Sequence, residues 1–334
     1  MNRKEVNKLA SGGIFNEVHL HGHVIETHIS WVILSDNLAF KIKKPVKLSF
    51  LDFSTLALRK KYCRRELSLN KQWSSIYKKV LPIRNTGGQF TIGGSKGRIV
   101  DYAVVMRRVS EKLRMDLLLG KNKVSIAQVK DIAAHLAVVH SKARKVKRPF
   151  SIRYARDLFN DIGKLADLER KIGGKPMLAF IERSVAWSNK FIDDHQQRFQ
   201  WRIQQGFQRD VHGDLHSGNI FLEHRPVIFD CIDFNNRYRQ IDILYEIAFL
   251  AMDIEAFGHS PLAKVLVKEY AGKINCIEDD EDLAILNYFK CLRANVRAKV
   301  HMLQATQTKD RVLAKHQANT ARKYLRLMNT YMHN

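Results

Sequence analysis

The side chains best suited to chemistry lie in one short segment, His212-Gly213-Asp214-Leu215-His216-Ser217-Gly218-Asn219. Transfer of a phosphoryl group from a nucleotide needs a carboxylate that orients or deprotonates the accepting hydroxyl, and an amide oxygen that helps to hold a magnesium ion. Asp214 and Asn219 lie five residues apart on one loop, directly before an apolar run that is typical of a strand. Asp214 is therefore the candidate catalytic base, and Asn219 is a candidate metal ligand.

A second carboxylate for the metal ion is expected after the next strand, in Asp230-Cys231-Ile232-Asp233-Phe234. Asp230 follows Asn219 by 11 residues, and Asp233 follows it by 14. Their odd separation would place the two carboxylates on opposite faces of a regular strand, unless the strand breaks between them and both face the site. Both are candidate metal ligands, and the spacing slightly favours Asp233.

The N-terminal part should supply a lysine for the phosphates and an acidic partner that orients it. Lys41 lies in the second strand of a predicted hairpin, and Glu66 lies in a predicted helix among basic residues. Their order along the chain favours an ion pair between a strand lysine and a helix glutamate. Lys43 shares a face of the strand with Lys41 and is the alternative.

Neither of the common glycine-rich phosphate loops, G-x-G-x-x-G and G-x-x-x-x-G-K-[ST], occurs in the sequence. The segment 26–30 would then cover the phosphates with its backbone amides and the hydroxyl of Thr27 or Ser30. Strand character gives way to helix after Met106. We expect a short hinge from Met106 to Ser110, with Met106 as a further candidate nucleotide contact.

The elements around these residues follow from the spacing of apolar and turn residues. Ser35-Asp36-Asn37 separates apolar runs at 29–34 and 38–43 and predicts a hairpin. Ser54 can cap a helix of about 20 residues that starts at Thr55. Further strands are expected over 80–83, 89–92, 99–106, 219–222 and 226–229.

This order of elements predicts an α+β fold with two lobes. Ser125 can cap a helix, and from there the sequence is mostly helical apart from the short strands near residue 220. A small β-rich N-terminal lobe is expected at 1–107. A larger, mostly helical C-terminal lobe is expected at 108–334, and it carries the catalytic loop and the metal site.

The net charge of +24 is concentrated in three zones. Residues 41–71 carry +8, residues 140–156 carry +7 and residues 287–334 carry +9, so the rest of the chain is neutral. Basic zones favour an anionic partner such as a nucleotide, a phosphorylated metabolite, nucleic acid or a membrane surface. They count against polycationic substrates, which need acidic pockets.

The cysteines and the apolar segments indicate the compartment. Four cysteines without CxxC spacing suggest neither a disulfide framework nor a Cys-rich zinc site. The longest apolar stretch, 243–257, is interrupted by Glu246, Asp253 and Glu255 and is too short to span a membrane. With no signal-peptide pattern at the N-terminus, the sequence predicts a soluble cytoplasmic protein without membrane insertion and leaves its oligomeric state open.

The loop motif, the Ile-Asp-Phe after it, and Asp242 and Glu246 beyond resemble the aminoglycoside phosphotransferase-like kinases, relatives of choline and fructosamine kinases with the protein-kinase fold. The motifs Glu26-Thr-His-Ile-Ser-Trp-Val, Lys41-Ile-Lys-Lys-Pro-Val and Phe229-Asp-Cys-Ile-Asp-Phe-Asn look like an uncharacterised bacterial subgroup of that superfamily. Many members of the subgroup look fused to a further P-loop domain, and this sequence has no such loop.

The resemblance implies ATP bound between two lobes and a role for each matched residue. It implies Lys41 on the phosphates with Glu66 as its partner, and Asp214 as the base. Asn219 with Asp230 or Asp233 would hold Mg²⁺.

The motifs together predict an ATP- and Mg²⁺-dependent phosphotransferase that transfers the γ-phosphate to a hydroxyl of a small-molecule acceptor other than an aminoglycoside. Phosphorylation of proteins on the same scaffold is one alternative, but the segment 234–241 is too short for a long activation segment and carries no Ala-Pro-Glu. Nucleic-acid binding through the basic zones, beside an inactive kinase site, is another. No RRM, KH or helix-turn-helix signature supports it.

Overall fold

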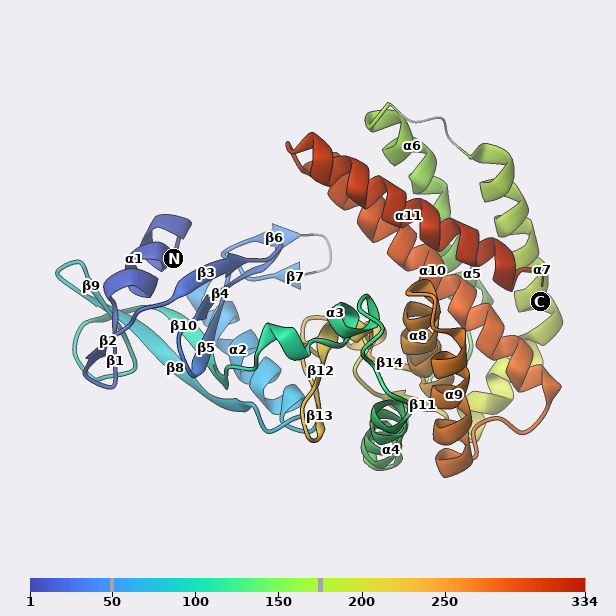
Figure 1. Cartoon of the computed structure of the whole chain (residues 1–334), viewed down its shortest axis with the longest axis horizontal. Helices are drawn as coiled ribbons and strands as arrows, with labels where there is room; N and C mark the ends of the chain where they lie inside the picture. Colours follow the sequence, from blue (N-terminus) through green and yellow to red (C-terminus); the bar gives the residue numbers. More distant parts are fainter. Residues whose placement is uncertain (49–50, 174–176, 334) are drawn as a thin grey trace. The chain divides into compact units, whose positions relative to one another are not determined.

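The computed structural model describes residues 1–48, 51–173 and 177–333, and Figure 1 shows their helices and strands. The chain divides into two compact units. The β-rich unit consists of Met1–Leu118 and Gly218–Arg239, and the helical unit consists of Leu119–Ser217 and Gln240–Asn334. The chain therefore passes from one unit to the other near residues 118, 217 and 239, whereas the sequence predicts a single boundary after residue 107.

The β-rich unit contains an eight-stranded sheet with the order β2-β1-β9-β8-β10-β5-β4-β3. Its strands are β1 (Ile14–Phe15), β2 (Val18–His19), β3 (His23–Glu26), β4 (Ser30–Leu34), β5 (Leu38–Lys43), β8 (Tyr77–Thr86), β9 (Gln89–Ile92) and β10 (Arg98–Arg107). Strands β1 and β9 run parallel, and the other neighbours run antiparallel. A separate pair, β6 (Lys47–Leu48) and β7 (Leu51–Asp52), follows β5.

The predicted hairpin is β4–β5. The turn closes where the Ser35 backbone N–H donates to the Leu38 carbonyl at 2.9 Å, and the register pairs Val32 with Lys41. Side chains alternate along a strand, so Lys41 and Lys43 extend from the same face of β5.

Each face of the sheet packs on its own apolar cluster. On one face, α1 (Arg3–Gly12) packs against Trp31, Phe40 and Ile42. On the other face, α2 (Leu56–Asn70) packs against strands β5, β8 and β10 (Figure 1). The lysines of β5 lie on this second face.

Helix α2 buries a polar face. Its N-cap is Thr55, and the helix is 15 residues long; the predicted cap, Ser54, instead hydrogen-bonds the Asp52 side chain. The buried residues of the helix are Arg59, Cys63, Glu66 and Asn70. Three of these four are polar, so α2 presents partners for other polar groups rather than an apolar stripe.

A hairpin from late in the chain folds with the β-rich unit. Strands β12 (Ile220–Leu222) and β13 (Pro226–Ile228) pair antiparallel, close to the predicted positions. Phe221 and Val227 join the apolar cluster of the α2 face, which also contains Val104. This apolar contact explains why Gly218–Arg239 belongs to the β-rich unit.

The helical unit is built from long helices around a buried one. Its helices are α4 (Ile126–Lys142), α5 (Ile152–Asn160), α6 (Lys164–Lys171), α7 (Leu178–Gln204), α8 (Ile243–Ala256), α9 (Ser260–Ile274), α10 (Asp280–Gln307) and α11 (Arg311–Tyr331), and α3 (Met115–Leu119) precedes them. Two short strands, β11 (Gln208–Asp210) and β14 (Gln240–Asp242), pair antiparallel. Ser125 caps α4 as predicted, α8 is buried nearly throughout, and α10 and α11 pack along one another (Figure 1).

The four cysteines are free thiols in the interior of the two units. Burial raises the pKa of Cys63 and of Cys276 to about 12. Burial also raises the pKa of Cys291. These three thiols are therefore protonated at neutral pH.

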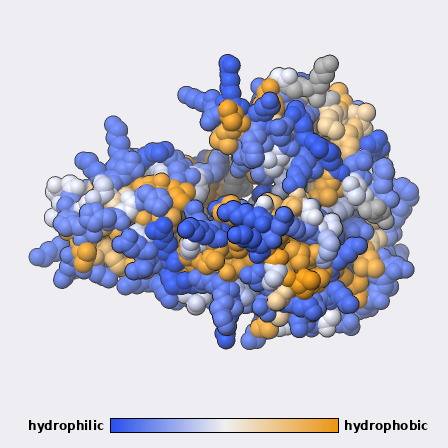
Figure 2. Space-filling view, viewed as in Figure 1, coloured by the Kyte–Doolittle hydropathy of each residue, from blue (hydrophilic) through white to orange (hydrophobic). Residues whose placement is uncertain are grey.

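The surface is mainly polar. Figure 2 shows hydrophilic residues over most of the visible face, with smaller apolar patches between them. Within the described ranges, no helix is long and apolar enough to cross a membrane.

Candidate active site

Lys41 and Lys43 both reach Glu66, a buried carboxylate on α2. Lys41 Nζ lies 2.8 Å from Glu66 Oε1, and Lys43 Nζ lies 2.9 Å from Glu66 Oε2. Burial opposes the charged form of these groups, but attraction between opposite charges lowers the pKa of Glu66 and raises the pKa of both lysines. The structure thus pairs Glu66 with both lysines that the sequence offers as alternatives.

The chain leaves the strand conformation just before the two candidate aspartates. Strand β13 ends at Ile228, and Asp230 has a φ of 65°, a left-handed conformation that residues other than glycine rarely adopt. Asp230 Oδ1 then lies 2.5 Å from Lys41 Nζ, and Asp233 Oδ2 lies 2.6 Å from Lys43 Nζ. The two carboxylates therefore face the same pair of lysines, as the strand-break alternative predicts.

The two aspartates differ in their access to solvent. The side chain of Asp233 is 7% exposed, and its partner Lys43 is 1% exposed. The side chain of Asp230 is 49% exposed. Asp230 is thus the carboxylate that a ligand from solvent can reach, and Asp233 is part of a buried ion-pair network.

Asn219 and Asp230 lie together at the open end of the β12–β13 hairpin. Ile220 is opposite Ile228, and the Phe229 backbone N–H donates to the Asn219 carbonyl at 3.1 Å, with Asp230 as the next residue. An amide oxygen and a carboxylate are ligands of the kind that Mg²⁺ prefers. Among the described side chains, no three His, Cys, Asp or Glu residues gather into a metal site, so an ion bound here would take further ligands from phosphates and water.

The remaining nucleotide candidates lie at the tip of the β3–β4 hairpin and at the end of β10. The Thr27 hydroxyl donates to the Ser30 carbonyl and accepts from the Ser30 backbone N–H, each at 3.0 Å, which closes the turn. The Ser30 hydroxyl is buried and has no hydrogen-bond partner within the described part of the chain. Met106 joins the apolar cluster of the α2 face beside Ala39 and Tyr77.

The loop with the candidate base belongs to the helical unit as far as Ser217, whereas Asn219 belongs to the β-rich unit. The Asp214 carboxylate is 43% exposed, and His216 Nε2 lies 3.7 Å from it. Packing would raise the pKa of Asp214, but its interactions with the imidazole of His216 and with Arg297 lower it below the ordinary value of 3.8. Asp214 is therefore ionised at neutral pH and can accept a hydrogen bond from a hydroxyl.

Two carboxylates of α8 hold the backbone of this loop. Glu246 accepts from the backbone N–H groups of His212 at 2.7 Å and of Gly213 at 3.0 Å. Asp253 accepts from the backbone N–H of Ser217 at 2.9 Å and from its hydroxyl at 2.5 Å. The two acids lie seven residues apart, about two helical turns, so they project from the same side of α8. Burial raises the pKa of Glu246 to about 7 despite its hydrogen bonds.

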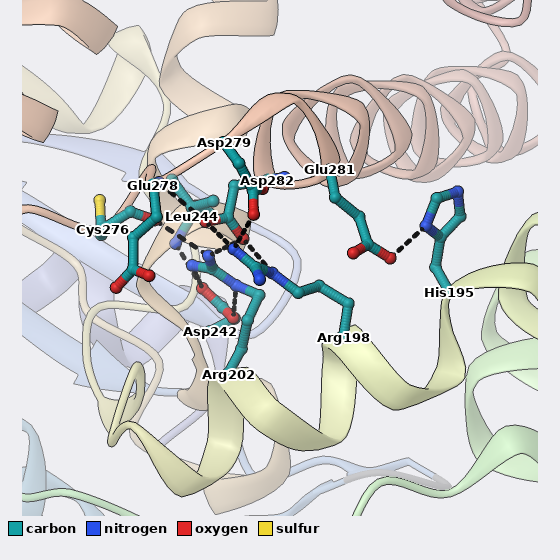
Figure 3. Close-up of polar contacts among 10 residues, drawn as sticks. All are labelled: His195, Arg198, Arg202, Asp242, Leu244, Cys276, Glu278, Asp279, Glu281 and Asp282. Carbon is teal, nitrogen blue, oxygen red and sulfur yellow. Dashed lines mark hydrogen bonds and ion pairs between the residues drawn. The ribbon is translucent and has the colours of Figure 1, made fainter.

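A buried ion cluster fixes the start of α8 (Figure 3). Arg202 of α7 donates to Asp242, the N-cap of α8, at 2.7 and 3.0 Å, and to Asp282 of α10 at 2.6 Å. Arg198, one turn earlier on α7, donates to the same Asp282 at 2.8 and 3.1 Å. The cluster ties α7, α8 and α10 together, and it thereby fixes the helix from which Glu246 and Asp253 project.

The sequence did not reveal that acids of α8 bind the backbone of the loop 212–217, although it contained a signal for buried acids. Glu246, Asp253 and Glu255 interrupt the longest apolar stretch of the sequence. An acid on a helix that is buried nearly all round needs a specific partner. Two of these acids have their partners in the loop 212–217, and Glu255 is paired with Lys290 and with the hydroxyl of Tyr331.

No family model matches the chain. An uncharacterised protein from Mycobacterium tuberculosis is 29% identical over 297 residues, which is 87% of this chain and 57% of that protein. An uncharacterised protein from Mycobacterium bovis matches to the same extent. The chain thus spans little more than half the length of the curated relatives that it matches.

Two solved structures share the fold. A choline kinase from Cryptosporidium parvum superposes with a TM-score of 0.55 at 11% identity, covering 94% of this chain and 93% of that one. An ethanolamine kinase from Plasmodium vivax superposes with a TM-score of 0.50 at 13% identity, covering 92% and 83%. The predicted kinase-like α+β fold, with a β-rich N-terminal part and a mostly helical C-terminal part, is therefore confirmed, and the resemblance to this superfamily is confirmed at the level of the fold.

Proposed function

We propose that the chain is an ATP- and Mg²⁺-dependent phosphotransferase that transfers the γ-phosphate to a hydroxyl of a small-molecule acceptor. The observation that carries the proposal is the position of Lys41 between Glu66 and Asp230, with Asn219 beside Asp230 at the end of its hairpin. A lysine oriented by a helix glutamate, next to a carboxylate and an amide that can hold a metal ion, is the set of groups that a nucleotide triphosphate needs. The fold shared with a choline kinase and an ethanolamine kinase supports the same class of reaction.

Each group of the β-rich unit has a role in this proposal. Lys41 exchanges its ion pair with Asp230 for the phosphate oxygens, and Glu66 keeps Lys41 oriented. Asn219 and Asp230 would hold Mg²⁺, which would neutralise phosphate charge during the transfer. Asp233 stays paired with Lys43 as buried support. The turn at Thr27 and Ser30, and Met106, remain proposed contacts of the nucleotide.

Asp214 of the helical unit orients the accepting hydroxyl and takes up its proton. Because the pKa of Asp214 is low, it is a weak base, and orientation is its main contribution. The chain from Asp214 to Asn219 can span at most about 18 Å when fully extended. This tether limits the distance between the proposed base and the proposed metal ligand, which belong to different units.

The proposed acceptor is a neutral or anionic hydroxyl compound rather than a polycation. Three acids of the helical unit that could attract a cation, Asp161, Asp253 and Glu255, are already paired. Asp253 and Glu255 accept hydrogen bonds from tyrosines of α11, and Asp161 pairs with Lys299 of α10. A cationic acceptor such as an aminoglycoside would have to displace these partners.

Labelled ATP tests the proposal directly. Protein incubated with γ-labelled ATP, Mg²⁺ and a panel of hydroxyl compounds should transfer label to a small molecule, and Asp214→Asn should lower that turnover by about 10²-fold or more. The panel should contain polyols, sugar phosphates, choline, ethanolamine and an aminoglycoside, together with a cell extract. Label on protein bands would favour a protein kinase instead. Turnover that Asp214→Asn leaves unchanged would remove Asp214 from the mechanism.

A further inference from the structure

The C-terminal helix α11 reaches the catalytic loop through one buried carboxylate. The Tyr324 hydroxyl donates to Asp253 Oδ1 at 3.0 Å, while Asp253 Oδ2 accepts both hydrogen bonds from Ser217. Tyr324 and Asp253 are 4% and 2% exposed, so water does not compete for these bonds. Ser217 follows the proposed base by three residues.

Helix α10 contacts the other end of the loop. Arg293 donates to the backbone carbonyl of Gly213 at 3.2 Å, and its guanidinium lies 3.8 and 4.4 Å from the ring centres of Tyr245 and Phe249. The α10–α11 pair is therefore linked to residues on both sides of Asp214, directly through Arg293 and by way of Asp253 through Tyr324. This places the basic zone 287–334, which carries no motif that we recognise, next to the loop that carries the chemistry.

The hydrogen bonds of Asp253 fix its orientation. A carboxylate inside an apolar helix that accepts three hydrogen bonds cannot turn without leaving an oxygen or a donor unsatisfied, and such loss is unfavourable in a buried site. Removal of the Tyr324 hydroxyl would leave Oδ1 without that donor. The carboxylate would then be held by its two bonds from Ser217 and the nearby charge of Arg297, and it would fix Ser217 less firmly.

We propose that Tyr324 and Asp253 are positioning residues through which α11 holds the segment 214–217 in place for phosphoryl transfer. The effect on turnover rests on the proposed phosphotransferase function, whereas the effect on the loop does not. Helix α11 would thus influence the reaction without contacting the reacting groups.

The same two helices provide a matched control. The Tyr331 hydroxyl of α11 donates to Glu255 of α8, in the same way that Tyr324 donates to Asp253. Glu255 also accepts from Lys290 of α10, and within the described residues it has no hydrogen bond to the loop 212–217. Tyr331→Phe thus removes a comparable bond between α11 and α8 without touching the path to Ser217.

Hydrogen exchange measures the link without any assay of activity. In the full-length protein, mass spectrometry of peptides that cover residues 207–221 should show exchange at the Ser217 amide about tenfold faster in Tyr324→Phe than in the wild type. Tyr331→Phe should leave that rate within about twofold of the wild type. Equal acceleration in both variants would indicate general loosening, and no acceleration in Tyr324→Phe would exclude the link.

A double variant tests whether Asp253 carries the effect. Asp253→Asn alone should accelerate exchange at Ser217, and adding Tyr324→Phe should change the rate by less than about twofold. Asp253→Leu, which removes both acceptor oxygens, is the alternative background if Asp253→Asn does not fold. Additive effects in both backgrounds would overturn the proposal.

The turnover measurement separates the two proposals. If the wild type transfers phosphate, Tyr324→Phe should lower kcat about tenfold and leave the KM for ATP unchanged, while Tyr331→Phe should change neither. Absence of phosphate transfer by the wild type would count against the proposed function, and the exchange rates would still decide the role of Tyr324. An altered KM with an unchanged kcat in Tyr324→Phe would contradict positioning of the base.

Discussion

Lys41 and Lys43 both pair with Glu66, yet their surroundings indicate different roles. Lys41 is 13% exposed and pairs with the reachable Asp230, whereas Lys43 and Asp233 are enclosed together. A lysine that can exchange its partner for a phosphate suits binding. Lys43, which is buried between the carboxylates of Glu66 and Asp233, is better placed to stabilise the fold.

Methionine substitutions should separate the two lysines. Lys41→Met should lower ATP turnover by about 10²-fold with a small change in stability, because Asp230 can remain solvated and Glu66 keeps its pair with Lys43. Lys43→Met should lower the free energy of unfolding by about 3–5 kcal/mol, because Asp233 is left buried without a cation. Denaturant unfolding and turnover of both variants measure the difference, and similar losses of stability would contradict it.

The same network distinguishes the two candidate metal ligands. Asp230→Asn should abolish turnover and keep the fold. Replacing the whole buried pair, in Lys43→Met with Asp233→Leu, should recover most of the stability that Lys43→Met alone loses, since buried ion pairs can be exchanged for apolar side chains. Recovery of turnover in that double variant would mean that Asp233 is no metal ligand, whereas recovery of stability without turnover would mean that Lys43 or Asp233 takes part in the chemistry.

Helix α8 links the protonation of a buried acid to stability. The pKa of Glu246 is raised from 4.5 to about 7 by burial, so the folded protein holds this proton more tightly than the unfolded chain does. The stability that the proton contributes is fully present below about pH 4.5 and is lost as the pH rises through about 7. His140, whose Nε2 lies 3.9 Å away, stays neutral over this range because burial lowers its pKa to about 3.

Glu246→Gln should therefore flatten the pH dependence of stability. Between about pH 5 and pH 7, the free energy of unfolding of the wild type, relative to the variant, should fall by up to about 1.4 kcal/mol per pH unit. Urea unfolding at several pH values measures both proteins. Parallel curves for the two proteins would show that Glu246 is ionised throughout.

Local patterns predict most of the elements, and the failures share a cause. The β4–β5 hairpin, the Ser125 cap and the β12–β13 hairpin follow from apolar alternation and turn residues. Helix α2 starts one residue later than expected and buries a polar face. Its partners come from distant positions: Arg59 pairs with Asp101, and the side chain of Asn70 accepts from the Cys231 backbone. Periodicity measures hydrophobicity and cannot indicate a buried surface made of such pairs.

The two aspartates show the same limit at the site. Their separation in sequence predicts opposite faces only if the strand continues, and it ends at Ile228 before either is reached. The left-handed backbone of Asp230 then turns both carboxylates toward the lysines. A non-glycine residue in that conformation is held there by tertiary contacts, which sequence spacing does not reveal.

The positive charge of the molecule is distributed differently from the three zones of the sequence. Lysines of the first zone are neutralised by Asp230 and Asp233, and Lys290 and Lys299 of the last zone pair with Glu255 and Asp161. These acids lie far from the zones in sequence. The local positive potential near a basic zone is therefore weaker than its sequence suggests, although the net charge of the chain is still +24.

Binding of the nucleotide should stabilise the whole protein. At about 100 times its Kd, Mg²⁺-ATP should add about 2.7 kcal/mol to the free energy of unfolding and raise the melting temperature. Lys41→Met should remove most of this shift, and Asp214→Asn, in the other unit, should retain it. Thermal unfolding with ATP, with GTP and with Mg²⁺ alone provides the measurement and its controls; no shift with any nucleotide would refute nucleotide binding.

Because the native thiols are buried, introduced cysteines can be labelled selectively to measure the distance between the two units. Maleimides react with exposed thiolates, and the four native cysteines are enclosed. A cysteine introduced at an exposed lysine, such as Lys96 in the β-rich unit or Lys315 in the helical unit, would therefore react far faster than any native one. Donor and acceptor dyes at those two positions would report the distance between the units as ATP is added, with all four native cysteines left in place.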